Sequence, residues 1–105
     1  MLVVRGQRQV EVAVGTSIDL VVTRPVAPND AVRYEWPDAP SVEGNAVRFR
    51  RLRIELPAPE DDGGVTTHHY ELEAVGPGTA RVVVTPRGLG PSAGQGPVHL
   101  DVVVR

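Results

Sequence analysis

Apolar residues recur at every second position along most of this chain of 105 residues. Clear examples lie at residues 9–14, 18–22, 70–74, 80–84 and 98–104. No segment places apolar residues at positions i, i+3, i+4 and i+7 over three helical turns, and ten prolines and eleven glycines interrupt the chain. Alternation with a period of two is typical of half-buried strands. The sequence therefore predicts an all-β protein with no room for a helix.

Seven or eight short strands fit into this length, each with one apolar face. Such strands bury their apolar faces either by packing two sheets face to face or by closing one sheet into a barrel. We therefore expect residues 1–105 to form a single domain, an immunoglobulin-like β-sandwich of antiparallel strands. The chain has no cysteine, so it lacks the Cys…Trp…Cys pattern of an antibody-type domain.

The apolar residues change parity between Phe49 and Leu52. One extra residue at Arg50-Arg51 would return them to the same face, as a β-bulge does, and a short turn is the alternative. The arginines of this segment are expected to lie on a solvated strand face, paired with Glu71 and Glu73 of a neighbouring strand. The competing interpretation is a basic patch for nucleic acid or a membrane surface.

Two further expectations concern packing. Residues 70–74 and 80–84 flank a Gly-Pro-Gly turn, which predicts a hairpin in which Arg81 lies on the same side as Glu71 and Glu73. Trp36, the one tryptophan in the chain, is expected to be buried between the sheets, as in other sandwiches.

The adjacent pair His68-His69 is not arranged as a metal site, because neighbours in a strand point to opposite faces. We expect one imidazole at the rim of the core and the other in solvent. The acidic stretch 60–64 lacks the D-x-D-x-D-G spacing of a calcium loop, and no serine lies in a G-x-S-x-G motif. The sequence therefore predicts no metal, no other cofactor and no enzyme activity.

The formal net charge is −2, which gives no general attraction to nucleic acid. No run of 18 apolar residues is present, so membrane insertion is not expected. The apolar start of the chain is interrupted at Arg5 and does not have the form of a secretion signal. The compartment is left open between the cytoplasm and a mature secreted fragment.

The order of several features carries a resemblance. In chain order they are VAVG at 12–15, the strand SIDLVV at 17–22, a loop with proline and asparagine, the aromatic pair Tyr34 and Trp36, a Gly63-Gly64 turn, the strand HHYELEA at 68–74, a G-x-G-T turn and a valine-rich strand. This layout, over about residues 10–104, resembles the chagasin-type inhibitors of papain-like cysteine peptidases. The resemblance implies the same immunoglobulin-like sandwich and a protein partner, with a papain-like cysteine peptidase as the candidate.

Members of that family inhibit through three loops at one end of the sandwich, and the resemblance places these loops at 25–31, 57–65 and 86–97. The family motifs are Asn-Pro-Thr-Thr-Gly-aromatic, G-x-G-G and Arg-Pro-Trp. Here the matching stretches read PVAPNDAVRY, DDGG and TPRGLG, so Thr-Thr-Gly and the tryptophan are missing. The residues implied to contact a partner are Pro28, Asn29, Asp30, Gly63, Gly64, Arg87 and Leu89.

Segment 86–97 holds four glycines and three prolines and is expected to form a long mobile loop without regular structure. The sequence thus predicts a non-catalytic domain that binds a protein through loops at one end, as the chagasin-like inhibitors do. The alternative is an immunoglobulin-like adhesion or assembly module without inhibitory activity.

Overall fold

The computed structural model describes residues 1–25, 34–57, 64–88 and 96–105, and these residues form strands and no helix. The strands are β1 (Leu2–Val4), β2 (Gln9–Val12), β3 (Ser17–Pro25), β4 (Tyr34–Glu35), β5 (Ser41–Glu43), β6 (Val47–Glu55), β7 (Val65–Ala74), β8 (Gly78–Val84), β9 (Arg87–Gly88) and β10 (Val98–Val104). The described residues contain no helix with the length and apolar character needed to cross a membrane.

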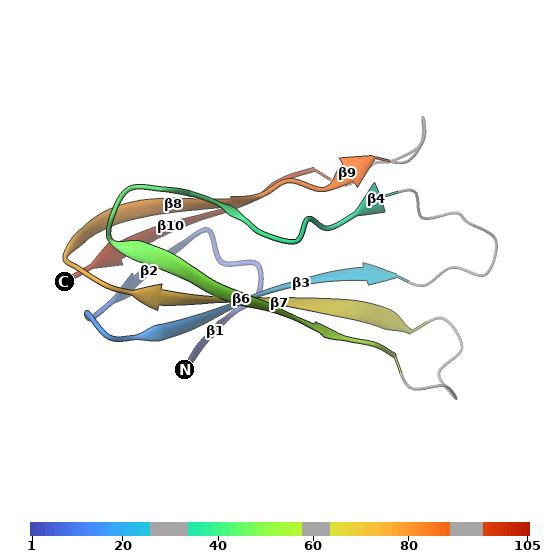
Figure 1. Ribbon diagram of the computed structural model, residues 1–105, viewed down its shortest axis with the longest axis horizontal. Coiled ribbons are helices and arrows are strands. Elements are labelled where there is room, and N and C mark those ends of the chain that lie inside the picture. Colours follow the sequence, from blue (N-terminus) through green and yellow to red (C-terminus); the bar gives the residue numbers. More distant parts are fainter. Residues whose placement is uncertain (26–33, 58–63, 89–95) are drawn as a thin grey trace.

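Two four-stranded sheets form a sandwich (Figure 1). Sheet A has the strand order β1-β3-β7-β6, and sheet B has the order β2-β10-β8-β5. Strands β4 and β9 form a separate two-stranded ladder, and β9 follows β8 towards one end of the molecule. The all-β sandwich expected from the alternating pattern is confirmed.

Two pairs of strands are parallel, whereas the sequence led us to expect antiparallel strands. β1 runs parallel to β3, with Leu2 opposite Ile18, and β2 runs parallel to β10, with Val10 opposite Val102. β1 and β2 run in opposite directions, because β3 finishes at the end of the sandwich where β10 begins, so the N-terminal segment turns between them and adds a short edge strand to each sheet. This division also helps to bring the described residues to ten strands, more than the seven or eight expected.

The predicted hairpin between β7 and β8 is wrong. β7 is hydrogen-bonded to β3 on one side and to β6 on the other, so it has no free edge for β8. The chain therefore crosses at residues 75–77 to sheet B, where β8 pairs with β10 and β5. Arg81 consequently pairs with Asp101 of β10, with Nε 3.0 Å from Oδ1, and not with Glu71 or Glu73.

The change of parity in β6 is a β-bulge, as predicted. The register of β6 against β7 shifts between Phe49 and Arg51, so Arg50 is the extra residue. The bulge lets two consecutive arginines reach the same neighbouring strand: Arg50 pairs with Glu73 at 2.8 Å, and Arg51 pairs with Glu71 at 2.9 Å. The interpretation of this segment as a solvated face paired with acids is therefore confirmed for these two arginines.

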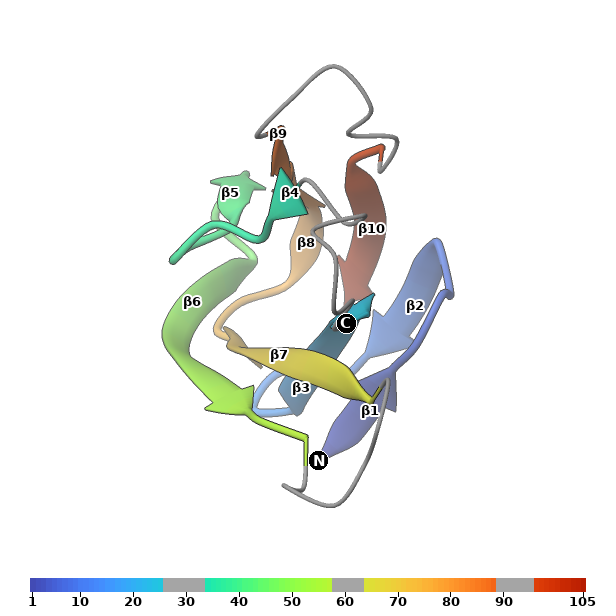
Figure 2. The same ribbon diagram turned by 90° about the vertical axis from the view of Figure 1, so that its right-hand side faces the viewer.

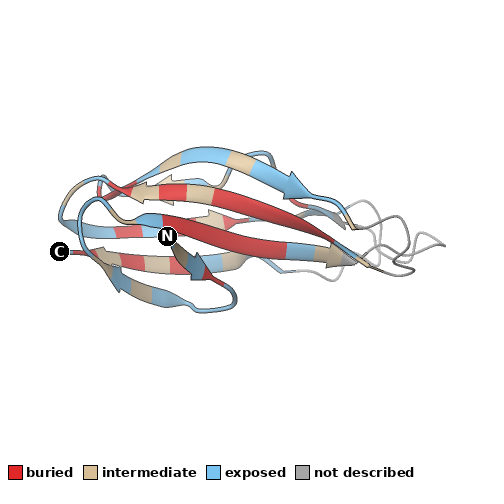
Figure 3. Ribbon diagram, turned by 90° about the horizontal axis from the view of Figure 1, so that it is seen from below, coloured by how far each residue is buried: buried red, intermediate tan, exposed pale blue. Residues whose placement is uncertain are grey.

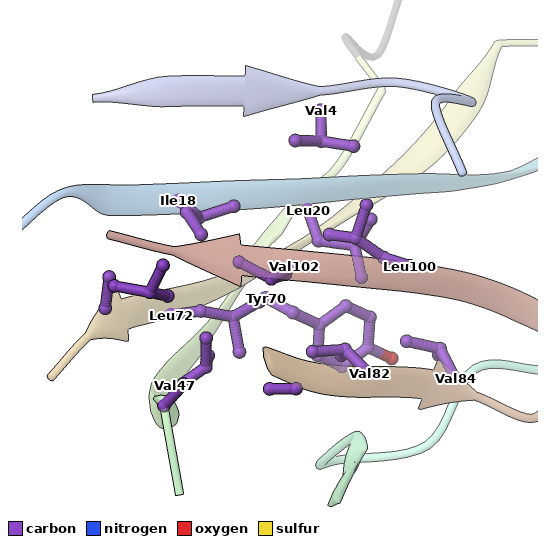
Figure 4. Packing of buried hydrophobic residues seen from close by; sticks show 14 of the residues in the cluster. Val4, Ile18, Leu20, Val47, Tyr70, Leu72, Val82, Val84, Leu100 and Val102 are labelled. Atoms are coloured by element: carbon purple, nitrogen blue, oxygen red, sulfur yellow. The ribbon is translucent and has the colours of Figure 1, made fainter. Parts of the chain in front are cut away.

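The core lies between the inner faces of the two sheets; buried residues alternate with less buried ones along β8 and β10, whereas β3 and β7 each have a continuous buried stretch (Figure 3). Tyr70 and Leu72 of sheet A pack with Val82 and Val102 of sheet B in one cluster (Figure 4). All four side chains are at most 1% exposed. Burial of one such side chain contributes roughly 1.5–3 kcal/mol to stability, so this cluster is the main source of stability.

Trp36 is buried, as the sequence predicts, with 7% of its surface exposed. It follows β4, and its indole Nε1 donates a hydrogen bond of 3.0 Å to the carbonyl oxygen of Thr23 in β3. The side chain therefore ties the segment after β4 to sheet A both by packing and by a hydrogen bond.

Replacement of this indole tests its role in the core. We expect Trp36→Ala to lower the free energy of unfolding by roughly 3–5 kcal/mol, because a large buried ring is lost and a cavity remains. Trp36→Phe keeps part of the packing and should cost less. Urea denaturation followed by circular dichroism measures both variants, and a cost for Trp36→Ala below that of Trp36→Phe would contradict the assignment.

Gly44 fills a position that a larger residue does not fit. It directly follows β5, has a φ of +96°, and a Cβ added to it would lie 2.7 Å from the backbone carbonyl oxygen of Thr79 in β8. Gly15 has nearly the same φ, +94°, but a Cβ there meets nothing within 4 Å. Substitution of Gly15 therefore tests conformational strain alone, whereas substitution of Gly44 adds a steric clash with the backbone of Thr79.

We expect Gly15→Ala to cost about 1–2 kcal/mol of stability from the left-handed backbone conformation alone. Gly44→Ala should cost more, since the turn must also move away from β8. Thermal or urea denaturation of the two variants provides the comparison. Equal losses would show that the close approach of Gly44 to Thr79 has no energetic consequence.

Candidate functional site

Several strands begin or finish at one end of the sandwich, which lies opposite the two chain termini (Figure 1). Figure 2 shows the molecule from this end. Strands β3, β6 and β9 finish here, and β4, β7 and β10 begin here: Pro25 of β3 lies opposite Val65 of β7, and Val98 of β10 lies opposite Val84 of β8. We call this region the loop end.

Two of the seven residues implied to contact a partner are described. Gly64 directly precedes β7 and is half-buried. Arg87 is exposed in β9, opposite Glu35 of β4. The remaining five lie outside the described residues: Pro28, Asn29, Asp30, Gly63 and Leu89.

The expectation that segment 86–97 has no regular structure is wrong for its first part. Arg87 and Gly88 form β9 and pair with Tyr34 and Glu35 of β4. Strand pairing uses backbone groups, which glycine also possesses, so a glycine-rich composition does not prevent a short ladder. Residues 89–95, on which the rest of that expectation falls, lie outside the described residues.

A cleft of about 320 Å³ opens at the loop end between the end of β6 and the segment after β4. Ile54 and Leu56 form its apolar wall. Both share the parity of Leu52, whose side chain packs against the core. They lie beyond the core, however, and are 49% and 74% exposed. The described residues that line the cleft are Arg24, Glu35, Trp36, Asp38, Ile54, Leu56, Thr66 and His68.

His68 is a buried member of this lining, with 8% of its surface exposed. Its ring is stacked on that of Tyr70, with a centroid separation of 6.3 Å, and its Nδ1 is buried without a hydrogen-bond partner in the part of the chain that the structure describes. Burial lowers the pKa of His68 below its ordinary value of 6.5, and the nearby guanidinium of Arg24 lowers it further. The imidazole is therefore held in its neutral form near pH 7.

Tyr70 links the cleft to the core. Its hydroxyl donates a hydrogen bond of 2.5 Å to the carbonyl oxygen of Pro37, and burial raises the pKa of this hydroxyl above its ordinary value. Together with the bond from Trp36 to Thr23, this contact fixes the segment that forms one wall of the cleft against sheet A.

His69 points to the opposite face of sheet A, as expected for adjacent residues in a strand. The expectation that one of the two histidines lies in solvent is wrong, because His69 is only 6% exposed. Its Nδ1 lies 2.9 Å from the Asp19 carboxylate, and Arg53 lies across the same pair, 4.0 Å from Asp19. A carboxylate partner allows this imidazole to be buried outside the apolar core.

Chemistry at these histidines is limited by their surroundings. Within residues 1–25, 34–57, 64–88 and 96–105, no three side chains of His, Asp, Glu or Cys lie together in a way that could hold a metal ion. Neither the role of Asp19 nor the cleft is predicted from the sequence. The shared parity of His68, Tyr70 and Leu72 was the available signal that His68 faces inward.

Comparisons with known proteins support the fold. No family model matches the chain, and no curated protein matches it either. Among solved structures, the solution structure of Amebosin is similar, with a TM-score of 0.59 and 18% sequence identity over 92% of this chain and 88% of that one. The likeness covers nearly the whole sandwich and at this identity shows the fold alone.

The lowered pKa of His68 predicts a pH dependence of stability. Between the folded-state pKa and 6.5, the unfolded chain binds more protons at this residue than the folded chain does, so the free energy of unfolding falls as the pH drops below about 6.5. The slope from one such group is at most about 1.4 kcal/mol per pH unit. Urea titrations between pH 7.5 and 5 measure it.

His68→Gln should remove this contribution, while His99→Gln, at an exposed histidine of β10, should leave it in place. The difference between wild type and each variant isolates His68 from the other titrating groups. A wild-type pH slope that persists unchanged in His68→Gln would show that the buried imidazole is not its source.

Proposed function

We propose that this protein is a non-catalytic binding domain that uses the loop end to engage a papain-like cysteine peptidase as an inhibitor. The observation that carries the proposal is the convergence of β3, β6 and β9, together with the strands that follow them, at one end of the sandwich. An inhibitor blocks the active-site cleft of a peptidase with a surface of complementary shape, and it needs no catalytic group of its own. A rigid sandwich that presents several connections at one end suits that task.

The layout of the sequence adds to this proposal. Its order of strands and turns resembles the chagasin-type inhibitors, which bind through three loops at one end. The likeness to the Amebosin structure supports the sandwich on which such loops would be mounted. The absent Thr-Thr-Gly and Arg-Pro-Trp motifs mean that the partner contacts are made by different side chains.

Exposed aliphatic side chains at the loop end also support a binding role. Leu56 directly follows β6 and is 74% exposed, and Val65 begins β7 and is 44% exposed. Interfaces between proteins bury such groups at their centres. Leu56 is the described residue whose substitution tests the surface most directly.

The test is a titration of a panel of papain-like peptidases with the full chain. We expect competitive inhibition of at least one enzyme, and we expect Leu56→Asp to weaken it about tenfold or more, since a charge is then forced into an apolar contact worth roughly 1.4 kcal/mol or more. Val14→Asp is the matched control, because Val14 is 48% exposed and lies beside the C-terminal residue, away from the loop end.

An equal loss of inhibition with Val14→Asp would show that the contact with the peptidase is not specific to the loop end. If no member of the panel is inhibited, the proposal fails and the assembly-module alternative takes its place.

A further inference from the structure

We infer that the cleft beside β4 binds a basic side chain, arginine or lysine, presented by a protein partner. The identity of that partner rests on the proposed function, but the binding site itself is a property of this chain. The inference comes from three features of the cleft: its unpaired charges, its shape and a buried polar atom beneath it.

The charges of the cleft are not paired with one another. No ion pair within 4.0 Å involves Glu35, Asp38 or Arg24 in the described part of the chain. By contrast, two arginines of β6 and Arg81 of β8 have carboxylate partners. Two carboxylates and one guanidinium leave the lining with one net negative charge while His68 is neutral. A cationic group is therefore attracted, and an anionic one meets two like charges.

The walls of the cleft match the two parts of a basic side chain. Ile54 and Leu56 offer an aliphatic surface on one side, and Glu35 and Asp38 lie on the other. Arginine and lysine combine an apolar stem with a cationic tip, so the stem can lie on the aliphatic wall while the tip reaches the carboxylates. The volume of about 320 Å³ is at the lower limit of ligand sites, roughly 300–1,000 Å³, which suits one side chain.

His68 adds a hydrogen-bonding group beneath the cleft. Its Nδ1 is buried and has no hydrogen-bond partner among the described residues, and a buried polar group without a partner is energetically costly. The N–H donors of a guanidinium or ammonium reach Nδ1 only when the atoms that cover it move and the tautomer of the neutral imidazole leaves Nδ1 as the acceptor, so the two carboxylates are the main attraction for the cation. The positive charge of Arg24 repels a cation here, but the two negative charges of Glu35 and Asp38 exceed it.

The experiment uses the complete chain labelled with nitrogen-15 and three small probes. These are N-acetyl-arginine amide, its uncharged isostere N-acetyl-citrulline amide, and N-acetyl-glutamate amide. The indole N–H of Trp36 reports directly on the cleft, because this residue lines it. We expect saturable shifts of this signal with the arginine probe, and binding of the citrulline and glutamate probes weaker by at least about two- to fivefold.

Asp38→Asn should weaken binding of the arginine probe about two- to fivefold, the range for an exposed ion pair. Glu11→Gln removes the same charge at the opposite end, where Glu11 pairs with Arg105, and should leave binding unchanged. Thermal denaturation confirms that both variants are folded.

Equal binding of arginine and citrulline, stronger binding of glutamate, or no shift of the Trp36 signal would each overturn the inference. The probes are applied without a peptidase, so the result does not depend on inhibition. Arginine binding without inhibition would leave the site standing and remove the peptidase as its partner. Inhibition without arginine binding would leave the proposed function standing and remove this site.

Discussion

The pairing of β7 on both of its edges is the constraint on which the rest of the structure depends. β3 and β6 flank this strand along nearly its whole length, so the chain that follows must cross to the other sheet. The inner side of β7 then supplies Tyr70 and Leu72 to the core. Its first half extends past the core and places His68 at the loop end. A single strand thus supplies both the centre of the sandwich and the floor of its cleft.

Two hydrogen bonds set the geometry of that cleft. The indole of Trp36 donates to β3, and the hydroxyl of Tyr70 donates to Pro37. Both donors are buried side chains of the core, so the segment after β4 is held by groups that cannot readily move. The cleft is therefore formed in the free protein, and a preformed site loses less entropy when a ligand binds.

The sequence predicts local structure well because alternation and breakers are local signals. It indicates the strands, the bulge at Arg50 and the burial of Trp36. It does not predict the crossing after Ala74, because a Gly-Pro-Gly turn suits a hairpin and a crossing equally and the choice depends on β3 and β6. The burial of His69 likewise depends on Asp19, fifty residues away in the chain, and the cleft combines four separate segments. Of the residues implied to bind a partner, Gly64 and Arg87 lie at the loop end.

The central claim is that partners bind at the loop end and not on a sheet face or an edge strand. Nitrogen-15 spectra of the full chain, recorded with and without a papain-like peptidase whose catalytic thiol is blocked, test it most directly. The account predicts that signals of the Trp36 indole, Gly64 and Arg87 shift or broaden first, while those of β2 and of the outer face of sheet B stay unchanged. Changes confined to β2, or to the arginine face of β6, would contradict it.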